Sequence, residues 1–151
     1  MKTAIIGTGN LGLSIAKGIL NSNGATSMYL TKRDTTAIAE FEKYDKVTVT
    51  NDNRIAVENS DILIFAVQPI HFAAILESIK DLLTDKHVII STITGFSIEK
   101  IEAVIGKDNF IIRSMPNTAI SVGKSMTCIC SNEKGKKRVE LAKAIFNRMG
   151  H

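Results

Sequence analysis

Three glycines, Gly7, Gly9 and Gly12, stand directly behind an apolar run in the segment "AIIGTGNLGLS", residues 4–14. A G-x-G-x-x-G spacing is weak by itself, but it becomes informative where it follows a strand and opens a helix. The apolar run before it and the helical spacing after it predict that context. Gly7 would allow the sharp turn, Gly9 would leave room for a pyrophosphate, and Gly12 would let the helix pack against the sheet.

The N–H groups of Asn10, Leu11 and Gly12 would be left without intrahelical partners at the start of this helix. Such groups lie at the positive end of the helix dipole and bind phosphate readily. We therefore predict that the pyrophosphate of a dinucleotide lies over this turn. The alternative is a glycine turn that holds no ligand.

The end of the second predicted strand, "LTKRD" at residues 30–34, indicates which dinucleotide is bound. An acidic residue there would hold the ribose 2′-hydroxyl of NAD. Here Lys32 and Arg33 occupy the corner, and cations attract the 2′-phosphate of NADP. We predict that NADPH is preferred over NADH. Asp34 would serve the hydroxyl if it turned inward, but we expect it to cap the next helix; ordinary surface cations are the alternative for the other two.

Two more segments end predicted strands, "FAVQP" at residues 65–69 and "STITGF" at residues 91–96. In a parallel α/β sheet, ligands lie against the carboxyl ends of the strands. The first segment offers an apolar shelf, an amide and a stiffening proline, and the second offers the hydroxyls of Thr92 and Thr94. The residues expected to contact the cofactor there are Ala66, Val67, Gln68, Pro69, Thr92, Ile93 and Thr94. The alternative for both segments is an ordinary turn that holds no ligand.

Strands and helices alternate along the whole chain. Predicted strands cover residues 3–8, 26–33, 46–50, 61–67, 87–92, 109–114 and 124–130, and predicted helices cover residues 10–23, 35–44, 53–60, 70–83, 97–105 and 133–150. The strands "DILIFAV" and "HVIIS" are apolar on both faces, as a parallel sheet covered by helices requires. We predict an α/β fold with a doubly wound, mostly parallel Rossmann-type sheet, helices on both faces and an antiparallel last strand. We expect residues 1–151 to form one dinucleotide-binding domain.

Composition supports an ordinary globular domain, with 151 residues of which 44% are hydrophobic and 23% charged. The longest apolar run, Ile62–Val67, is far shorter than the ~20 residues of a membrane span. The N-terminus lacks a signal-peptide pattern, so we expect a cytoplasmic protein without a membrane segment. The net charge is +4, but the lysines are mostly scattered, which favours a solvated basic face over a nucleic-acid surface.

The cysteines and histidines do not indicate a metal site. Cys128 and Cys130 alternate along the last predicted strand, and we expect buried or half-buried free thiols there. His71, His87 and His151 share no ligand spacing with them. We therefore expect no metal.

Four segments together resemble pyrroline-5-carboxylate reductase in order and separation. They are "IIGTGNLG" at residues 5–12, "SDILIFAVQP" at residues 60–69, "STITGFSIEKIE" at residues 91–102 and "IIRSMPNTAISVG" at residues 111–123. Glycine turns are common to many dehydrogenases, but "RSMPNT" followed by "VG" is close to a signature of this family. The resemblance covers essentially the whole chain.

The resemblance implies NAD(P)H-dependent reduction of 1-pyrroline-5-carboxylate to L-proline, the last step of proline biosynthesis. The cofactor supplies a hydride to an already electrophilic imine, so little acid–base machinery is needed and no residue is assigned as catalytic. The cofactor contacts that it implies are Ile6, Gly7, Thr8, Gly9, Asn10, Leu11, Lys32, Arg33, Asn53, Ala66, Val67, Gln68, Pro69, Thr92, Ile93 and Thr94. The wall beside the nicotinamide and the substrate is implied at Met115, Pro116, Asn117 and Thr118.

The chain departs from the family pattern in two ways. Gln68 stands where lysine is usual, Thr94 where alanine is common and Ala119 where proline usually follows, which affects fine cofactor geometry. Family members also carry a C-terminal helical domain that forms the homo-oligomer and holds the substrate carboxylate, and the 151 residues contain no such domain. A truncated chain and a natural fragment both fit. We expect this chain to bind cofactor without turning over substrate.

Two other functions remain as alternatives. One is another dehydrogenase of the same superfamily, such as a 3-hydroxyacid dehydrogenase or a coenzyme F420-dependent NADP reductase; "RSMPNT" would not be expected there. The other is a non-catalytic module that senses NADP, which the missing helical domain would favour.

Overall fold

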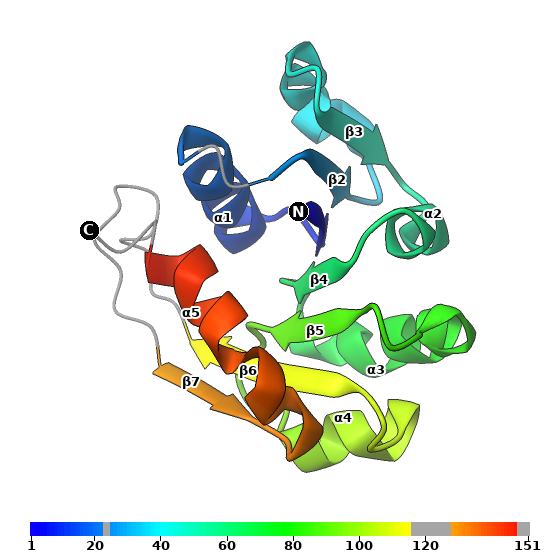
Figure 1. Ribbon diagram of the computed structural model, residues 1–151. Coiled ribbons are helices and arrows are strands. Elements are labelled where there is room, and N and C mark those ends of the chain that lie inside the picture. The colour runs from blue at the N-terminus through cyan, green and yellow to red at the C-terminus, as the bar shows by residue number, and fades with distance from the viewer. Residues whose placement is uncertain (23–24, 116–127, 148–151) are drawn as a thin grey trace.

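The structure, a computed structural model, describes residues 1–22, 25–115 and 128–147. Its centre is a seven-stranded sheet in the order β3-β2-β1-β4-β5-β6-β7, shown in Figure 1. The strands are β1 (Lys2–Ile6), β2 (Ser27–Thr31), β3 (Val47–Thr50), β4 (Ile62–Phe65), β5 (Val88–Ser91), β6 (Phe110–Met115) and β7 (Cys128–Ser131). The first six are parallel, and β7 pairs antiparallel with β6. The predicted mostly parallel sheet with an antiparallel edge strand is confirmed.

Helices cover both faces of the sheet. They are α1 (Asn10–Asn21), α2 (Asn53–Glu58), α3 (Pro69–Ile79), α4 (Ile98–Ile105) and α5 (Val139–Asn147), with 3-10 segments η1 (Thr35–Lys43), η2 (Lys80–Leu82) and η4 (Lys134–Arg138). One apolar cluster joins the strands to α1 and α5, and the other joins them to α2, α3 and α4. In Figure 1, α5 crosses in front of the sheet and α3 lies behind it.

Strand residues divide between these two clusters by alternation. Along β4, Ile64 faces the α1 side and Leu63 the α3 side, and both are fully buried. The same holds for Ile90 and Ile89 in β5. Strands buried on both faces are the reason that these runs read as continuously apolar in the sequence.

The segment after β2 forms a 3-10 helix, η1, where the sequence predicts an ordinary helix. Its buried residues are Ile38 and Phe41, three positions apart, which fits three residues per turn. Asp34 caps this helix as predicted, with its carboxylate accepting hydrogen bonds from the N–H and the hydroxyl of Thr36 at 3.1 and 2.6 Å. These hydrogen bonds lower the pKa of the Asp34 carboxyl.

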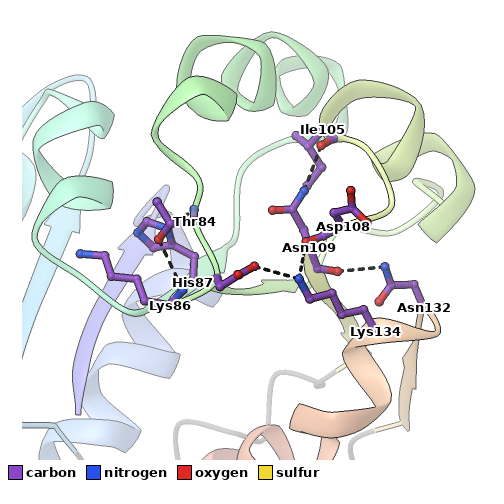
Figure 2. A network of polar contacts seen from close by, with 9 residues as sticks. Thr84, Lys86, His87, Ile105, Asp108, Asn109, Asn132 and Lys134 are labelled. Atoms are coloured by element: carbon purple, nitrogen blue, oxygen red, sulfur yellow. Dashed lines mark hydrogen bonds and ion pairs between the residues drawn. The ribbon is translucent and has the colours of Figure 1, made fainter.

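A polar network joins the residues that follow β7 to the edge at which β5 and β6 begin, as Figure 2 shows. The side-chain oxygen of Asn132 accepts from the N–H of Ile111 at 3.2 Å, and its amide nitrogen donates to the carbonyl of Asn109 at 3.0 Å. Lys134 donates to the carbonyl of Asp108 at 2.7 Å. This network lies at the amino ends of the strands and leaves their carboxyl ends to the site described below.

Cys130 corrects one prediction. Its thiol is free but exposed, whereas a buried or half-buried thiol was expected. It lies on β7, the last strand of the sheet, opposite Arg113 in register, and no strand among residues 1–22, 25–115 and 128–147 pairs with β7 on its outer side. Among the described residues no group of three or more potential ligands could hold a metal ion. No helix in that part of the chain is long and apolar enough to cross a membrane.

Candidate functional site

The glycine turn joins β1 to α1 at the carboxyl edge of the sheet, where the parallel strands end. Gly7 has φ of +90°, a conformation that favours glycine, and a Cβ on it would lie 2.5 Å from Cγ1 of Val67. A Cβ on Gly12 would lie 2.2 Å from the carbonyl oxygen of Gly7. The turn role of Gly7 and the close-packing role of Gly12 are confirmed.

Gly9 differs from the other two glycines because its surroundings are open. A Cβ added there would meet no atom within 4 Å. Gly9 is also the N-cap of α1, and no side chain caps it. The N–H of Leu13 donates to the Gly9 carbonyl at 2.9 Å, which is the first hydrogen bond of the helix. The N–H groups of the three residues before Leu13 therefore have no acceptor within the helix. The positive end of a twelve-residue helix therefore opens onto a free surface.

The end of β2 holds the glycine turn in place. The hydroxyl of Thr8 donates to the carbonyl of Thr31 at 3.0 Å, and the ammonium of Lys32 donates to the carbonyl of Thr8 at 3.2 Å. Sequence reasoning identified Lys32 and Thr8 but missed Thr31. The sequence feature that could have indicated Thr31 is its hydroxyl at the last position of a strand whose end is otherwise apolar.

A cavity of about 350 Å³ lies at this edge, between the glycine turn and the segments that leave β4 and β5. Its size falls in the range of small-molecule sites. It is lined by Gly9, Asn10, Leu11, Ala66, Val67, Gln68, Pro69, Thr92, Ile93 and Thr94. All ten were predicted as cofactor contacts, and the fold brings them together from three separate parts of the chain.

The remaining predicted residues surround this cavity or support it. Ile6 and Thr8 are buried beneath the turn. Lys32 and Arg33 follow β2, and Asn53 opens α2 behind its cap Asp52; none of these lines the cavity. The other predicted wall begins at Met115, which ends β6 and is 39% exposed, whereas Pro116, Asn117 and Thr118 lie outside the described residues.

The segment that leaves β5 is held on both sides. The hydroxyl of Thr92 donates to the carbonyl of Phe65 at 2.7 Å, which ties it to the end of β4. On the other side, Nη2 of Arg113 donates to the carbonyl of Ile93 at 3.3 Å. Sequence reasoning did not select Arg113, although it interrupts an apolar strand just before the "SMPNT" run.

Within the part of the chain that the structure describes, the cavity lining contains no ionisable side chain. His87, the buried histidine, precedes β5 at the opposite edge of the sheet, and His71 is exposed on α3. The lining thus offers backbone N–H groups, amides, hydroxyls and apolar walls. These groups can bind and orient a phosphate-containing ligand.

Comparison with known proteins agrees with this geometry. Residues 2–95 match the family model described as NADP oxidoreductase coenzyme F420-dependent. Pyrroline-5-carboxylate reductase 1 of Dictyostelium discoideum is 38% identical over 97% of this chain, which spans 29% of that relative.

Two solved structures are also similar. A pyrroline-5-carboxylate reductase from Coxiella burnetii superposes with a TM-score of 0.90 at 32% identity, covering 99% of this chain and 56% of that one. The Plasmodium falciparum pyrroline carboxylate reductase with NADP bound gives a TM-score of 0.87 at 27% identity, covering 99% and 55%. The resemblance predicted from four sequence segments is therefore confirmed, over about half the length of these structures.

Proposed function

Because the chain belongs to the family described as NADP oxidoreductase coenzyme F420-dependent, we propose that it is the cofactor-binding part of a pyrroline-5-carboxylate reductase. The observation that carries this proposal is the ten-residue cavity at the open start of α1, in a chain similar to such reductases over nearly its whole length. The family match ends at residue 95. The "IIRSMPNTAISVG" segment at residues 111–123 lies beyond it and favours this reductase over an F420-dependent enzyme.

The cofactor in this proposal is NADP, and NADPH is preferred over NADH. The amides of Asn10 and Leu11 would hold the pyrophosphate, and the open side of Gly9 leaves room for it. Lys32 and Arg33 would attract the 2′-phosphate. Asp34 is already engaged by Thr36, which supports a cationic rather than an acidic ribose corner. The Plasmodium relative contains NADP.

The strand order supports one direction for the bound dinucleotide. β1 lies between β2 and β4, so the turn after β1 is at the middle of the site. The ribose corner belongs to β2, and the nicotinamide half therefore extends over the ends of β4, β5 and β6. Met115 and Cys128 are register partners across β6 and β7, so the described chain on either side of residues 116–127 lies at this edge. The proposed nicotinamide and substrate wall, Met115 to Thr118, begins there.

The proposed reaction is reduction of 1-pyrroline-5-carboxylate to L-proline. When bound, NADPH supplies a hydride for the imine carbon, and the imine nitrogen carries the proton. The residues of this chain would bind and orient the cofactor. The hydroxyl of Thr92 donates to the Phe65 carbonyl and so fixes the segment that leaves β5, while Val67 and Ile93 present apolar walls to the cavity. Gln68 and Thr94, which depart from the family pattern, both line the cavity and would adjust how the cofactor sits.

A binding assay and a turnover assay test this function separately. We expect calorimetry to detect NADPH binding by the 151-residue chain. We expect no NADPH oxidation when pyrroline-5-carboxylate is added, because the described cavity supplies one wall and further orienting groups are needed for efficient turnover. A full-length relative serves as the positive control. Absence of NADPH binding would refute the cofactor role, and turnover comparable to the control would refute the need for a second domain.

A further inference from the structure

Arg113 is a half-buried arginine in β6 without an acidic partner in the described part of the chain. Its Nη2 donates to the carbonyl of Ile93 at 3.3 Å and lies 3.8 Å from Sδ of Met115. Its Nε is buried, and among the described residues it has no hydrogen-bond partner. No carboxylate within those residues forms a salt bridge with it.

Such an arrangement does not favour stability by itself. A buried N–H without a partner has lost its hydrogen bonds to water and gains none in return. The β6 residues before Arg113, Ile111 and Ile112, are fully buried and apolar, so the sheet accepts an apolar side chain on either face. Core packing therefore does not explain why a guanidinium stands at the end of this strand.

The contacts of Arg113 connect two strand exits. Ile93 belongs to the segment that leaves β5 and lines the cavity, and Met115 ends β6. On the side of β4, the same segment is held by the hydroxyl of Thr92. Arg113 supplies the matching restraint on the side of β6, so the segment is fixed from both of its neighbours.

These exits lie on one side of the cavity only. The strand order places β5 and β6 beyond β4, away from β2 and its ribose corner. A dinucleotide whose pyrophosphate lies at the β1 turn and whose adenosine half lies at β2 therefore places its nicotinamide half over β4 to β6.

We propose that Arg113 is a positioning residue that holds the Thr92–Thr94 segment against the end of β6 and thereby shapes the nicotinamide half of the cofactor site. This inference rests on the proposed function. It assigns Arg113 no contact with the adenosine half. Loss of its guanidinium should then lower the affinity for ligands that contain nicotinamide and leave the affinity for ligands without it unchanged.

The test compares two ligands, NADPH and adenosine 2′,5′-bisphosphate, in the variants Arg113→Met and Arg113→Lys. For Arg113→Met we expect NADPH to bind about tenfold more weakly, with the bisphosphate affinity unchanged within about twofold. Arg113→Lys keeps the charge but not the planar donor group, and we expect a smaller loss of the same selectivity. Calorimetry measures both affinities.

Arg138→Met is the matched control. Arg138 stacks its guanidinium on Phe110 at 4.4 Å, at the first residue of β6, the end of the strand far from the cavity. We expect this variant to lower thermal stability without changing the ratio of the two affinities.

The outcomes separate the inference from the proposed function. An unchanged NADPH affinity in Arg113→Met, or equal weakening of both ligands, would overturn the positioning role while leaving cofactor binding intact. If Arg113→Met does not fold, the ratio of the NADPH and bisphosphate affinities is measured in Arg113→Lys instead. A ratio equal to that of the unsubstituted chain refutes the positioning role. Failure of the unsubstituted chain to bind either ligand would refute the proposed function and the inference with it.

Discussion

The backbone N–H of Gly7 donates to the hydroxyl of Thr31 at 3.2 Å. This hydrogen bond joins the glycine turn to the last residue of β2, and the Thr8 hydroxyl returns a second bond to the Thr31 carbonyl. The turn proposed to hold the pyrophosphate and the corner proposed to hold the 2′-phosphate are thereby one connected unit. Their relative position is set before any ligand arrives.

Replacing Thr31 with valine tests this connection. The change keeps the shape of the side chain but leaves the N–H of Gly7 without its acceptor, so we expect the free energy of unfolding to fall by about 1 to 3 kcal/mol. Urea denaturation measures it. Thr31→Ser, which keeps the hydroxyl, is the control and should lose less. Equal stabilities for the valine variant and the unsubstituted chain would show that the hydroxyl contributes nothing.

Gly9→Val separates folding from cofactor binding. Gly9 has φ of −75° and open surroundings, so valine fits the free protein. We expect normal circular dichroism and thermal stability, because no protein atom is displaced. We also expect NADPH binding to be lost, because the side chain fills the approach to the amides of α1. Unchanged calorimetric affinity in the folded variant would place the site elsewhere.

Gly12→Ala, unlike Gly9→Val, should destabilise the folded protein itself. Its methyl group would lie 2.2 Å from the carbonyl oxygen of Gly7, a backbone atom that cannot move aside cheaply. We expect a lower midpoint of thermal unfolding, since overpacking commonly costs about 1 to 3 kcal/mol. A variant as stable as the unsubstituted chain would show that α1 can shift away from β1.

The cofactor preference depends on two cations. If both Lys32 and Arg33 contact the 2′-phosphate, each contact is worth about 1.5 to 3 kcal/mol, or roughly 10- to 150-fold in affinity. We expect the double variant Lys32→Ala, Arg33→Ala to lose more affinity for NADPH than for NADH. The smaller loss for NADH comes from the missing Lys32 hydrogen bond to the Thr8 carbonyl. Parallel titrations with the two nucleotides measure this. Equal affinities in the unsubstituted chain would contradict the preference and would restore Asp34 as a ribose ligand.

We expect His87 to make the free energy of unfolding depend on pH. Its Nδ1 accepts from the N–H of Thr84 at 3.0 Å and its Nε2 lies 3.0 Å from the carbonyl of Val57, as the neutral ring with the proton on Nε2 requires. Figure 2 shows the ring beside Thr84. Burial, the largest cause, and the charge of Lys86 lower the pKa of His87, while the Val57 hydrogen bond and Asp61 act the other way.

The sign follows from proton counting. With its pKa lowered in the folded state, His87 binds fewer protons there than in the unfolded chain, so stability falls as the pH drops below about 6.5. We expect urea midpoints at pH 5 to be lower than at pH 7.5, and His87→Gln to reduce that difference. His71→Gln, at an exposed position of α3, is the control. An unchanged pH dependence in His87→Gln would assign the effect to other groups.

Much of the site was predictable because strand ends in a parallel sheet converge at one edge. The segments after β1, β4 and β5 are each recognisable locally, by glycines, by a proline and by threonines. Once the alternation of strands and helices predicts a parallel sheet, their assembly follows from topology. The ten cavity residues therefore needed no knowledge of individual contacts.

What the sequence did not predict depends on contacts between distant positions. Thr31 and Arg113 matter through hydrogen bonds to Gly7 and Ile93, and no local pattern around either residue encodes those partners. The exposure of Cys130 follows from its place on the last strand of the sheet, where alternation alone does not tell which face is covered.

The strand order also has a consequence for how the protein emerges from the ribosome. β1 is made first but lies between β2 and β4, so one of its two neighbours is missing until residue 65 has been synthesised. The cavity itself takes residues from 9 to 94. Because a nascent chain grows from its N-terminus, most of the domain must be synthesised before the glycine turn has a complete pocket beside it. Nucleotide added to ribosome-bound chains should therefore stabilise only those whose exposed portion extends past Thr94.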